Sequence, residues 1–388
     1  IQRSSHMDTS PREAEHPVDK IHAIIQQALS EGEGSASPVF QAQRSVFPEG
    51  NMMASSDLSR RSLLQQLLGL TSLTTAFSQQ GNPLAPLLSI PTSVRSLDAP
   101  ALNMLHNLIE ACWQLCNVGQ MRLVEHVLAA VLPELVERAA FQRQAAQLTA
   151  HGLRLKSLLE AHQLRLAQMI PLCLQSVAYA QAANDPDSLS AALNGLAVAY
   201  KYNRQFHRSF EAYEAALLAS EQATPLLRSR VSAGAAAAFA TRGFKQEALR
   251  LIGLAYEQFP EHPEQNPFFY SADNGLFMLI YYEGLVYLAL GEPEKALQAF
   301  EKSKELAVPE RNRLEMVNHW GRAAILAGDL DLYTFCLEEG VRGAIALQSQ
   351  KRLDEAIEIF QEQVPRSWQA ESSLRQVAEK CALPFTAA

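Results

Sequence analysis

The chain has 388 residues, of which 48% are hydrophobic and 19% are charged, and its formal net charge is −8. This length suits two ordinary domains or one elongated array, and the composition predicts that most of the chain buries a core. The mildly acidic balance argues against non-specific binding of DNA or RNA by the chain as a whole. No apolar run in the sequence reaches the ~18 residues that a membrane-spanning helix needs, so we expect no role in a membrane.

The cysteines are odd in number and show no regular spacing. The chain has five: Cys112, Cys116, Cys173, Cys336 and Cys381. This usage predicts a reduced, cytoplasmic protein and not a disulfide framework. Cys112 and Cys116 stand four residues apart on an expected helix, but no second Cys/His pair follows at ligand spacing. We therefore interpret them as core thiols and expect no metal site.

The N-terminal quarter of the chain has the weakest pattern. Residues 1–6 precede the first methionine, and we interpret them as a remnant of a cloning tag, outside the fold. Residues 7–97 are expected to contain two amphipathic helices and a flexible linker, and to be partly disordered. The linker prediction rests on residues 30–53, which are rich in Ser, Gly, Pro and Gln and show no periodicity.

The second of these helices carries the pair Arg60-Arg61, followed by the apolar run LLGLTSL. The pattern resembles a twin-arginine export signal. The favoured interpretation is an ordinary amphipathic helix that keeps both arginines in water, because no A-x-A-like cleavage site follows. An exported binding protein is the weaker alternative.

Residues 98–388 read as helices almost throughout, and their clearest pattern lies at 279–309. Gly284 and Ala296 are small residues where two helices of a pair would touch. Phe300 would fill the space beside them, and Gly291 would occupy the turn. This spacing resembles the tetratricopeptide repeat, a pair of antiparallel helices.

Two preceding stretches, 190–219 and 229–260, place comparable residues at the same positions, and weaker periodicity extends over 101–381. The resemblance implies an all-α fold in which about six antiparallel helix pairs stack into a right-handed superhelix, an α-solenoid. Residues 352–363, with Ala356, Ile357 and Phe360, are expected to be the second helix of a last, irregular pair. Residues 366–381 would form the C-terminal capping helix.

More narrowly, the chain from residue 59 onward resembles the C-terminal sensor region of bacterial helix-turn-helix regulators of the XRE type that carry such repeats. The stretches that carry this resemblance are 107–120, 223–264 and 272–296. In that family a DNA-binding domain precedes the array. Residues 7–56 show one helix and a linker, not the helices that a reader of the major groove requires. We expect DNA to be reached only through a missing domain or a partner.

In such an array the first helix of each pair lines the concave side. Counting from the small-residue position places several polar or aromatic side chains there. The predicted ligand- or peptide-binding residues are Asn194, Lys201, Arg230, Tyr281, Asn318 and Arg322. Asn can pair with both the N–H and the C=O of a peptide, and Arg can hold a carboxylate through two hydrogen bonds. The alternative is that these side chains merely solvate the concave wall.

No catalytic or nucleotide-binding motif is found: H-E-x-x-H, G-x-S-x-G and the P-loop pattern are all absent from the sequence. We therefore expect no enzyme and no cofactor. The favoured function is a regulatory sensor that binds a peptide, a small ligand or a protein partner in its concave groove, in bacterial transcription regulation. The alternative is a passive scaffold that joins proteins without a ligand switch. The oligomeric state, including a homodimer, stays open.

Overall fold

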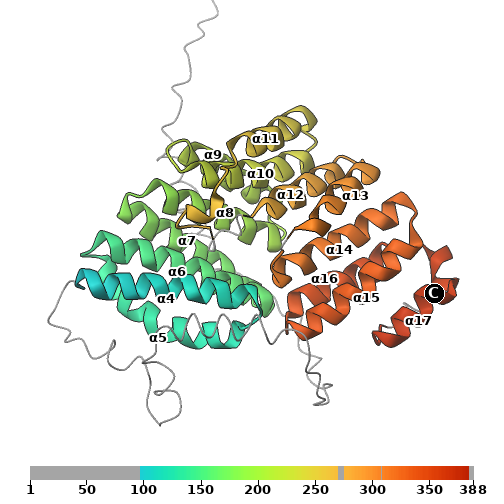
Figure 1. Cartoon of the computed structure of the whole chain (residues 1–388), viewed down its shortest axis with the longest axis horizontal. Coiled ribbons are helices and arrows are strands. Elements are labelled where there is room, and N and C mark those ends of the chain that lie inside the picture. The colour runs from blue at the N-terminus through green and yellow to red at the C-terminus, as the bar shows by residue number, and fades with distance from the viewer. Residues whose placement is uncertain (1–96, 270–274, 307, 384–388) are drawn as a thin grey trace, which may run out of the picture. The chain divides into compact units, whose positions relative to one another are not determined.

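The computed structural model describes residues 97–269, 275–306 and 308–383 (Figure 1). The helices and linker expected in residues 7–96, and with them the Arg60-Arg61 motif, lie outside the described residues. All described residues belong to one unit, which spans 49–388.

Every regular element that the structure describes is a helix, which confirms the all-α prediction. The α-helices are α4 (Ala99–Asn117), α5 (Met121–Ala139), α6 (Arg143–His162), α7 (Leu166–Ala183), α8 (Pro186–Tyr202), α9 (Phe206–Ser220), α10 (Pro225–Thr241), α11 (Lys245–Gln258), α12 (Leu276–Ala289), α13 (Pro293–Glu301), α14 (Glu310–Ala327), α15 (Leu330–Ala346), α16 (Gln350–Glu362) and α17 (Ser372–Lys380). Short 3₁₀ turns follow α11, α13 and α16.

Successive helices pack as antiparallel neighbours: α4 on α5, α6 on α7, α8 on α9, and so on to α14 on α15. Each even-numbered helix also contacts the next even-numbered one, from α4 through to α16. The array therefore has two layers. We call the even-numbered helices the inner layer; they correspond to the first helix of each predicted pair. This arrangement confirms the stacked, tetratricopeptide-like α-solenoid.

The small residues lie where the repeat pattern requires them. A Cβ built on Gly284 in α12 would stand 2.3 Å from Cε1 of Phe300 in α13, a distance that real atoms do not adopt. Phe300 and Ala296 are both fully buried in the same pair. Gly291 links the two helices with φ of +72°, a left-handed conformation that a residue without a Cβ adopts without strain. The glycine at position 284 is thus what lets the two helices approach.

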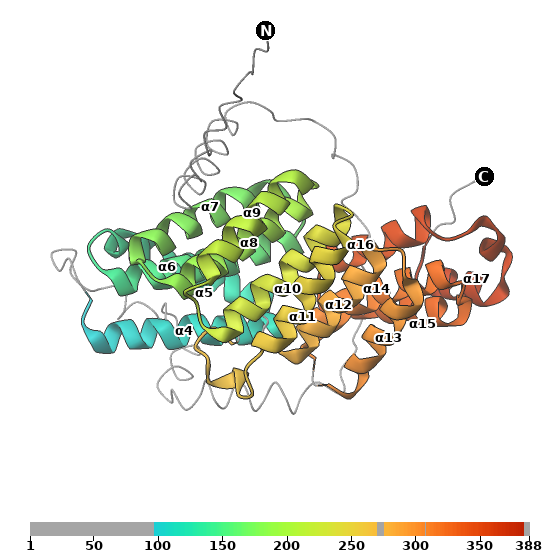
Figure 2. The ribbon, with the colours of Figure 1, turned by 90° about the horizontal axis from the view of Figure 1, so that it is seen from above.

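The inner layer closes on itself. α14 contacts α4, and α16 contacts α6, although these helices are about 200 residues apart in sequence (Figure 1, Figure 2). Leu314 of α14 and Leu347, at the end of α15, belong to the same buried apolar cluster as residues of α4, α5 and α6. We call this contact between the first and last helices the seam. It encloses the concave side, which an open array would leave accessible along its whole length.

Two polar contacts join the helices across the seam. The Arg311 guanidinium in α14 donates to Oδ1 of Asn117 in α4, with Nη2 at 3.0 Å and Nε at 3.3 Å. Nδ1 of His162, at the end of α6, lies 2.7 Å from the hydroxyl oxygen of Ser349, which caps α16. All four side chains are buried, so water competes little with these contacts.

The position of α16 differs from the expected one. The spacing of Ala356, Ile357 and Phe360 predicted the second helix of a pair, yet α16 contacts α14 and α6 and so lies in the inner layer, as a first helix does. Arg352, at the start of α16, is buried and pairs with Glu315 of α14, which holds α16 against the inner layer. The small-residue pattern does not register such an ion pair.

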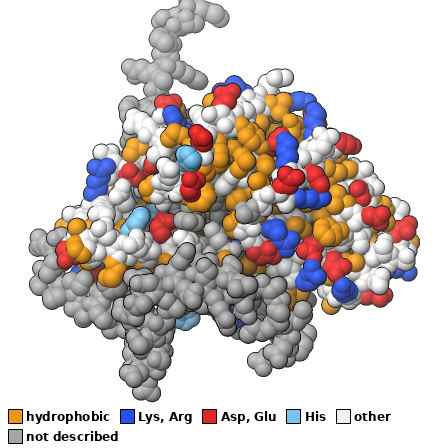
Figure 3. Space-filling model, in the orientation of Figure 1, with side chains coloured by type: hydrophobic (Ala, Val, Ile, Leu, Met, Phe, Trp, Pro, Cys, Tyr) orange, Lys and Arg blue, Asp and Glu red, His pale blue; other side chains and the backbone are white. Residues whose placement is uncertain are grey.

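The segment between α11 and α12 packs back onto the array. Phe268 is buried among Ala191, Ala223 and Leu227, and its ring meets that of His151 edge-on at 4.3 Å between centroids. Phe268 therefore packs against the array. On the face shown in Figure 3, apolar side chains gather above the centre, in the region where Figure 1 draws α10 and α12.

The cysteine prediction is confirmed where it concerns packing. Cys112, Cys116, Cys173 and Cys336 are buried, and none of the five cysteines forms a disulfide among the described residues. Nowhere in the described ranges do three metal-ligating side chains come together. No described helix is both long and apolar enough to cross a bilayer.

Candidate functional site

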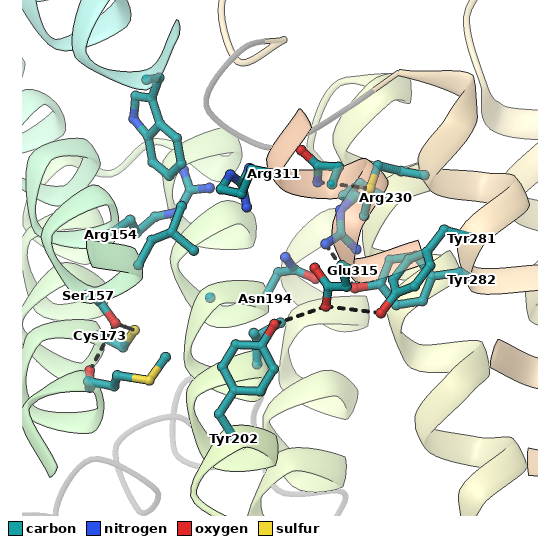
Figure 4. Close-up of a pocket in the computed structure, with 17 residues that line it drawn as sticks. Arg154, Ser157, Cys173, Asn194, Tyr202, Arg230, Tyr281, Tyr282, Arg311 and Glu315 are labelled. Atoms are coloured by element: carbon teal, nitrogen blue, oxygen red, sulfur yellow. Dashed lines mark hydrogen bonds between the residues drawn. The ribbon is translucent and has the colours of Figure 1, made fainter. Parts of the chain in front are cut away.

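The inner layer encloses a cavity of about 90 Å³, which we call the inner chamber (Figure 4). Helices α4, α6, α7, α8, α10, α12 and α14 all contribute to its wall. Its charged and amide side chains are Arg154, Asn194, Arg230, Arg311, Asn312 and Glu315. Its aromatic side chains are Trp113, Tyr202, Tyr281 and Tyr282. A chamber of this volume holds about three water molecules, or one small polar group.

A second cavity of about 440 Å³, the outer chamber, adjoins the first, and Tyr282 forms part of both walls. Its apolar and aromatic lining residues are Phe206, Tyr213, Ala237, Ala238, Leu285 and Leu288. Its charged and imidazole lining residues are Lys201, Arg242, His319 and Arg322. No Asp or Glu is found among the described residues that line it.

The six predicted binding residues do not all meet. Asn194, Arg230 and Tyr281 line the inner chamber, and Lys201 and Arg322 line the outer one. Five of the six therefore face the two adjoining chambers, as the counting from the repeat pattern predicts. Whether they bind a ligand stays a prediction.

The sixth, Asn318, lies apart from both chambers. Its side-chain amide donates to the backbone carbonyl of Arg352 at 3.0 Å. A Cβ on Gly340 would come within 2.6 Å of its Oδ1, so α15 covers the other side of the amide. Asn318 thus ties α14 to α16, and we leave it out of the candidate site.

Glu315 is the centre of the inner chamber's hydrogen bonds. Its Oε1 accepts from the hydroxyl of Tyr202 at 3.1 Å and from that of Tyr281 at 3.0 Å, as the dashed lines in Figure 4 show. Its other oxygen pairs with Arg352. Burial by itself would raise the pKa of Glu315, but Arg352 and the neighbouring cation Lys351 outweigh it and hold that pKa well below the usual value. The carboxylate is therefore ionised.

Behind Glu315, the first turn of α16 supplies two buried cations and a second carboxylate. Arg352, whose side chain is 1% exposed, donates through Nη1 to Glu355 at 2.6 Å. The ammonium of Lys351 lies 2.5 Å from the same carboxylate and 3.7 Å from the ring centroid of Tyr202. Burial tends to raise the pKa of Glu355, and Arg352 and Lys351 lower it to about 2. These groups fix the position of Tyr202 and Glu315.

Arg230 and Tyr282 form the partition between the two chambers. The guanidinium lies 4.5 Å from the centroid of the Tyr282 ring and donates to its hydroxyl at 3.0 Å. Because Arg230 is itself buried, its removal would disturb packing as well as charge. It is a poor choice for a variant intended to test binding alone.

Oδ1 of Asn194, Oδ1 of Asn312 and Nε1 of Trp113 are buried polar atoms of the inner chamber that have no hydrogen-bond partner among the described residues. The exposed fractions of Asn194 and Asn312 are 6% and 4%. A buried acceptor without a donor costs about 1–3 kcal/mol. The chamber can therefore gain from a ligand that supplies N–H donors to two amide oxygens from opposite helices, α8 and α14.

His319 faces the outer chamber from α14. Burial, and then the nearby charge of Lys201, lower its pKa to about 3, so the imidazole is neutral. Its Nδ1 is buried and has no hydrogen-bond partner in the described part of the chain. A neutral ring can donate or accept there, according to its tautomer.

The site residues that were not predicted from the sequence include Trp113, Arg154, Arg311 and Tyr282. The helices of Trp113 and Arg154 belong to the first pairs, whose repeat match is poor, so no position could be counted from a small residue. Arg311 reaches the chamber only because the seam brings α14 beside α4. Tyr282 could have been predicted, because it directly follows Tyr281 in a helix whose register was assigned.

We expect acid to weaken the seam through His162. Burial lowers the pKa of His162 well below 6.5. The positive charges of Arg352, Arg311 and Lys351 lower it further, whereas the negative charge of Glu315 raises it. The unfolded chain therefore takes up a proton near pH 6.5 that the folded chain does not, so stability falls as pH falls below 6.5. His162→Gln should lessen this slope by about 1.4 kcal/mol per pH unit. Melting temperatures of both proteins between pH 8 and pH 5 test it, and parallel curves would contradict it.

The comparisons with known proteins concern structure only. No family model matches the chain, and no curated protein matches it in sequence. Among solved structures, the apo form of the quorum sensor NprR from B. thuringiensis aligns with a TM-score of 0.41 and 15% identity, over 84% of this chain and 93% of NprR. PilF of Pseudomonas aeruginosa aligns with a TM-score of 0.34 and 17% identity, over 61% of this chain and 99% of PilF.

The geometry defines the class of protein. Antiparallel helix pairs, close contact at a glycine and a layer of first helices around an inner cavity are features of a tetratricopeptide-type array. The described part of this array is distinguished by its seam, which encloses the cavity between the first and last helices of the inner layer.

Proposed function

We propose that the chain is a non-catalytic sensor module that binds a peptide in the two chambers and thereby regulates a protein partner. The resemblance to repeat-bearing regulators supports a role in bacterial transcription, with DNA reached through a domain or partner outside this array. The odd number and irregular spacing of the cysteines support a cytoplasmic location.

The observation that carries this proposal is the pair of unpartnered amide oxygens in the inner chamber. Asn194 on α8 and Asn312 on α14 lie in the same wall as Glu315, which is already bound by Tyr202 and Tyr281. A core that only needed to pack would place apolar residues of similar size there. Backbone N–H groups of a peptide are donors of the required kind, and the outer chamber provides space for the adjoining residues.

Helix α14 connects the site to the seam. Asn312 and Glu315 face the inner chamber, whereas Arg311 and Leu314, on the same turns, hold α14 against α4. A ligand that draws α14 toward α8 must therefore alter the contact between α14 and α4. Because the seam closes the array, a small shift there changes the relation of its two ends, which a partner can detect.

The test uses a random octapeptide library and Asn194→Leu, an exchange of nearly equal volume. We expect the variant to be as stable as the wild type or slightly more so, because it removes an unpartnered acceptor. Its affinity for the tightest selected peptide should fall about tenfold. Calorimetry measures the affinity and thermal unfolding the stability.

Failure to select any peptide would contradict the proposal, as would unchanged affinity in Asn194→Leu. Solution scattering with and without the selected peptide separates a sensor from a passive scaffold. We expect the radius of gyration to change on binding, whereas a scaffold would keep its dimensions.

A further inference from the structure

We infer that the peptide is acidic, with a carboxylate that binds in the outer chamber between Lys201 and Arg322 and an apolar side chain that packs on the apolar residues of that chamber. This inference rests on the proposed function, because it names the chemistry of the ligand that the two chambers receive. It is carried by the charges of the outer chamber.

The cations of the outer chamber lack carboxylate partners. Lys201 and Arg322 make no hydrogen bond or ion pair with any side chain in the described ranges. Arg242 lies over the ring of Phe210, with 4.7 Å between the guanidinium carbon and the ring centroid. Three positive charges thus border one cavity whose described lining has no acid.

The chain as a whole is acidic, with a net charge of −8. Several cations elsewhere on the array are paired with a glutamate. Examples are Lys245 with Glu292, Lys302 with Glu283, and Lys380 with Glu338. With acids in excess over bases, cations that line a cavity without an acid indicate that the carboxylate comes from a ligand.

Glu315 is the carboxylate whose charge Lys201 affects, but it does not occupy the outer chamber. Its oxygens are already bound by Tyr202, Tyr281 and Arg352. Lys201 helps to lower the pKa of Glu315 and of His319, which shows that its charge acts toward this interior. The hydrogen-bonding capacity of Lys201 itself is not used by Glu315.

The remaining wall suits an apolar side chain beside the carboxylate. Leu285 and Leu288 of α12 and Ala237 and Ala238 of α10 provide an apolar surface in the same chamber as the cations. The chamber's volume, equal to that of roughly fifteen waters, admits a side chain together with its backbone. Apolar walls lower the local dielectric constant and so strengthen the attraction between the cations and a carboxylate. The Arg322 fork can bind both carboxylate oxygens.

Four sublibraries of octapeptides test the inference: one with a fixed Glu, one with a fixed Gln, one with a fixed Lys, and the Gln set with an amidated C-terminus. Binding is measured by fluorescence anisotropy at low and high salt. We expect the Glu set to bind about tenfold more tightly than the Lys set, with a difference that shrinks in salt. A Gln set that binds well only with a free C-terminus would assign the carboxylate to the chain end.

The variant Lys201→Met with Arg322→Gln should abolish the preference for the anionic peptides. The matched control is Arg122→Gln with Arg366→Gln, which removes the same charge at exposed positions outside both chambers. The control should retain the preference, because the effect belongs to the chamber and not to net charge.

The outcomes separate the two proposals. Equal binding of all four sets, the amidated one included, or a preference that survives in Lys201→Met/Arg322→Gln, would overturn the acidic ligand while cavity binding stands. A preference for anionic peptides that is lost equally in Arg122→Gln/Arg366→Gln would also overturn the acidic ligand. Absence of binding by every set would overturn the proposed function, and the inference with it.

Discussion

Glu315→Leu is expected to destabilise the protein by about 3–5 kcal/mol, the range for breaking a buried ion pair by removal of one partner. Glu315 is 12% exposed and Arg352 1%. Without Glu315, the buried cations Arg352 and Lys351 share a single carboxylate, that of Glu355. The hydroxyls of Tyr202 and Tyr281 also lose their common acceptor. Urea unfolding followed by circular dichroism measures the loss.

The double variant Glu315→Leu/Arg352→Leu provides the control. It removes both charges of the pair and leaves Lys351 with Glu355, so we expect it to be more stable than Glu315→Leu alone. If the double variant were less stable by the sum of the two single effects, the buried pair would not be coupled and the interpretation would be wrong.

The same cluster predicts an acid transition. The pKa of Glu355 is lowered to about 2 and that of Glu315 lies well below 4.5, so both carboxylates bind protons more readily in the unfolded chain. Their contribution to stability is therefore complete above about pH 4.5 and is lost as pH falls toward 2. Glu355→Gln should unfold with a weaker pH dependence in this range.

Gly284→Leu is expected to reduce the free energy of unfolding by about 3 kcal/mol, at the upper end of the usual overpacking range. Even a single Cβ at this position would lie 2.3 Å from Phe300, whose buried ring has no space into which to move. The longer leucine would separate α12 from α13 and displace Tyr281 and Tyr282, which line the chambers. Thermal and urea unfolding give the size of the effect.

Two controls accompany this variant. Gly253→Ala, in exposed helix α11, meets no atom within 4 Å and should stabilise the protein by about 0.5–1 kcal/mol through helix propensity alone. Combining Gly284→Ala with Phe300→Leu should cost less than the sum of the single changes, because the smaller side chain makes room for the methyl group. A neutral Gly284→Leu would show that the repeat register is incorrect.

The closed inner layer changes what the concave side can do. In an open array the concave wall is a groove that accepts an extended segment along its length. Here Arg311–Asn117 and His162–Ser349 hold the ends together, so the wall becomes two chambers of limited volume. A ligand must be small, or enter by one end, and its binding is linked through α14 to the seam.

Much of the local architecture could be predicted from the sequence. The repeat stretches predicted at 190–219 and 229–260 fall on the helix pairs α8–α9 and α10–α11, because helix periodicity and turn residues act over short distances. Gly284 with Phe300 could be assigned for the same reason, since both belong to one hairpin of helices. Counting from such positions placed Asn194, Lys201 and Arg322 on the inner face correctly.

The sequence by itself thus determined the helices, their pairing and the layer that faces inward, because each of these depends on neighbours within about forty residues. Only the tertiary structure decided that α14 and α16 contact α4 and α6, that Asn318 donates a hydrogen bond to the backbone of α16 and that Glu315 pairs with Arg352. Small rotations between successive pairs accumulate along the array, and their sum, which no single repeat encodes, determines whether its ends meet. The chambers exist because the ends of the inner layer meet.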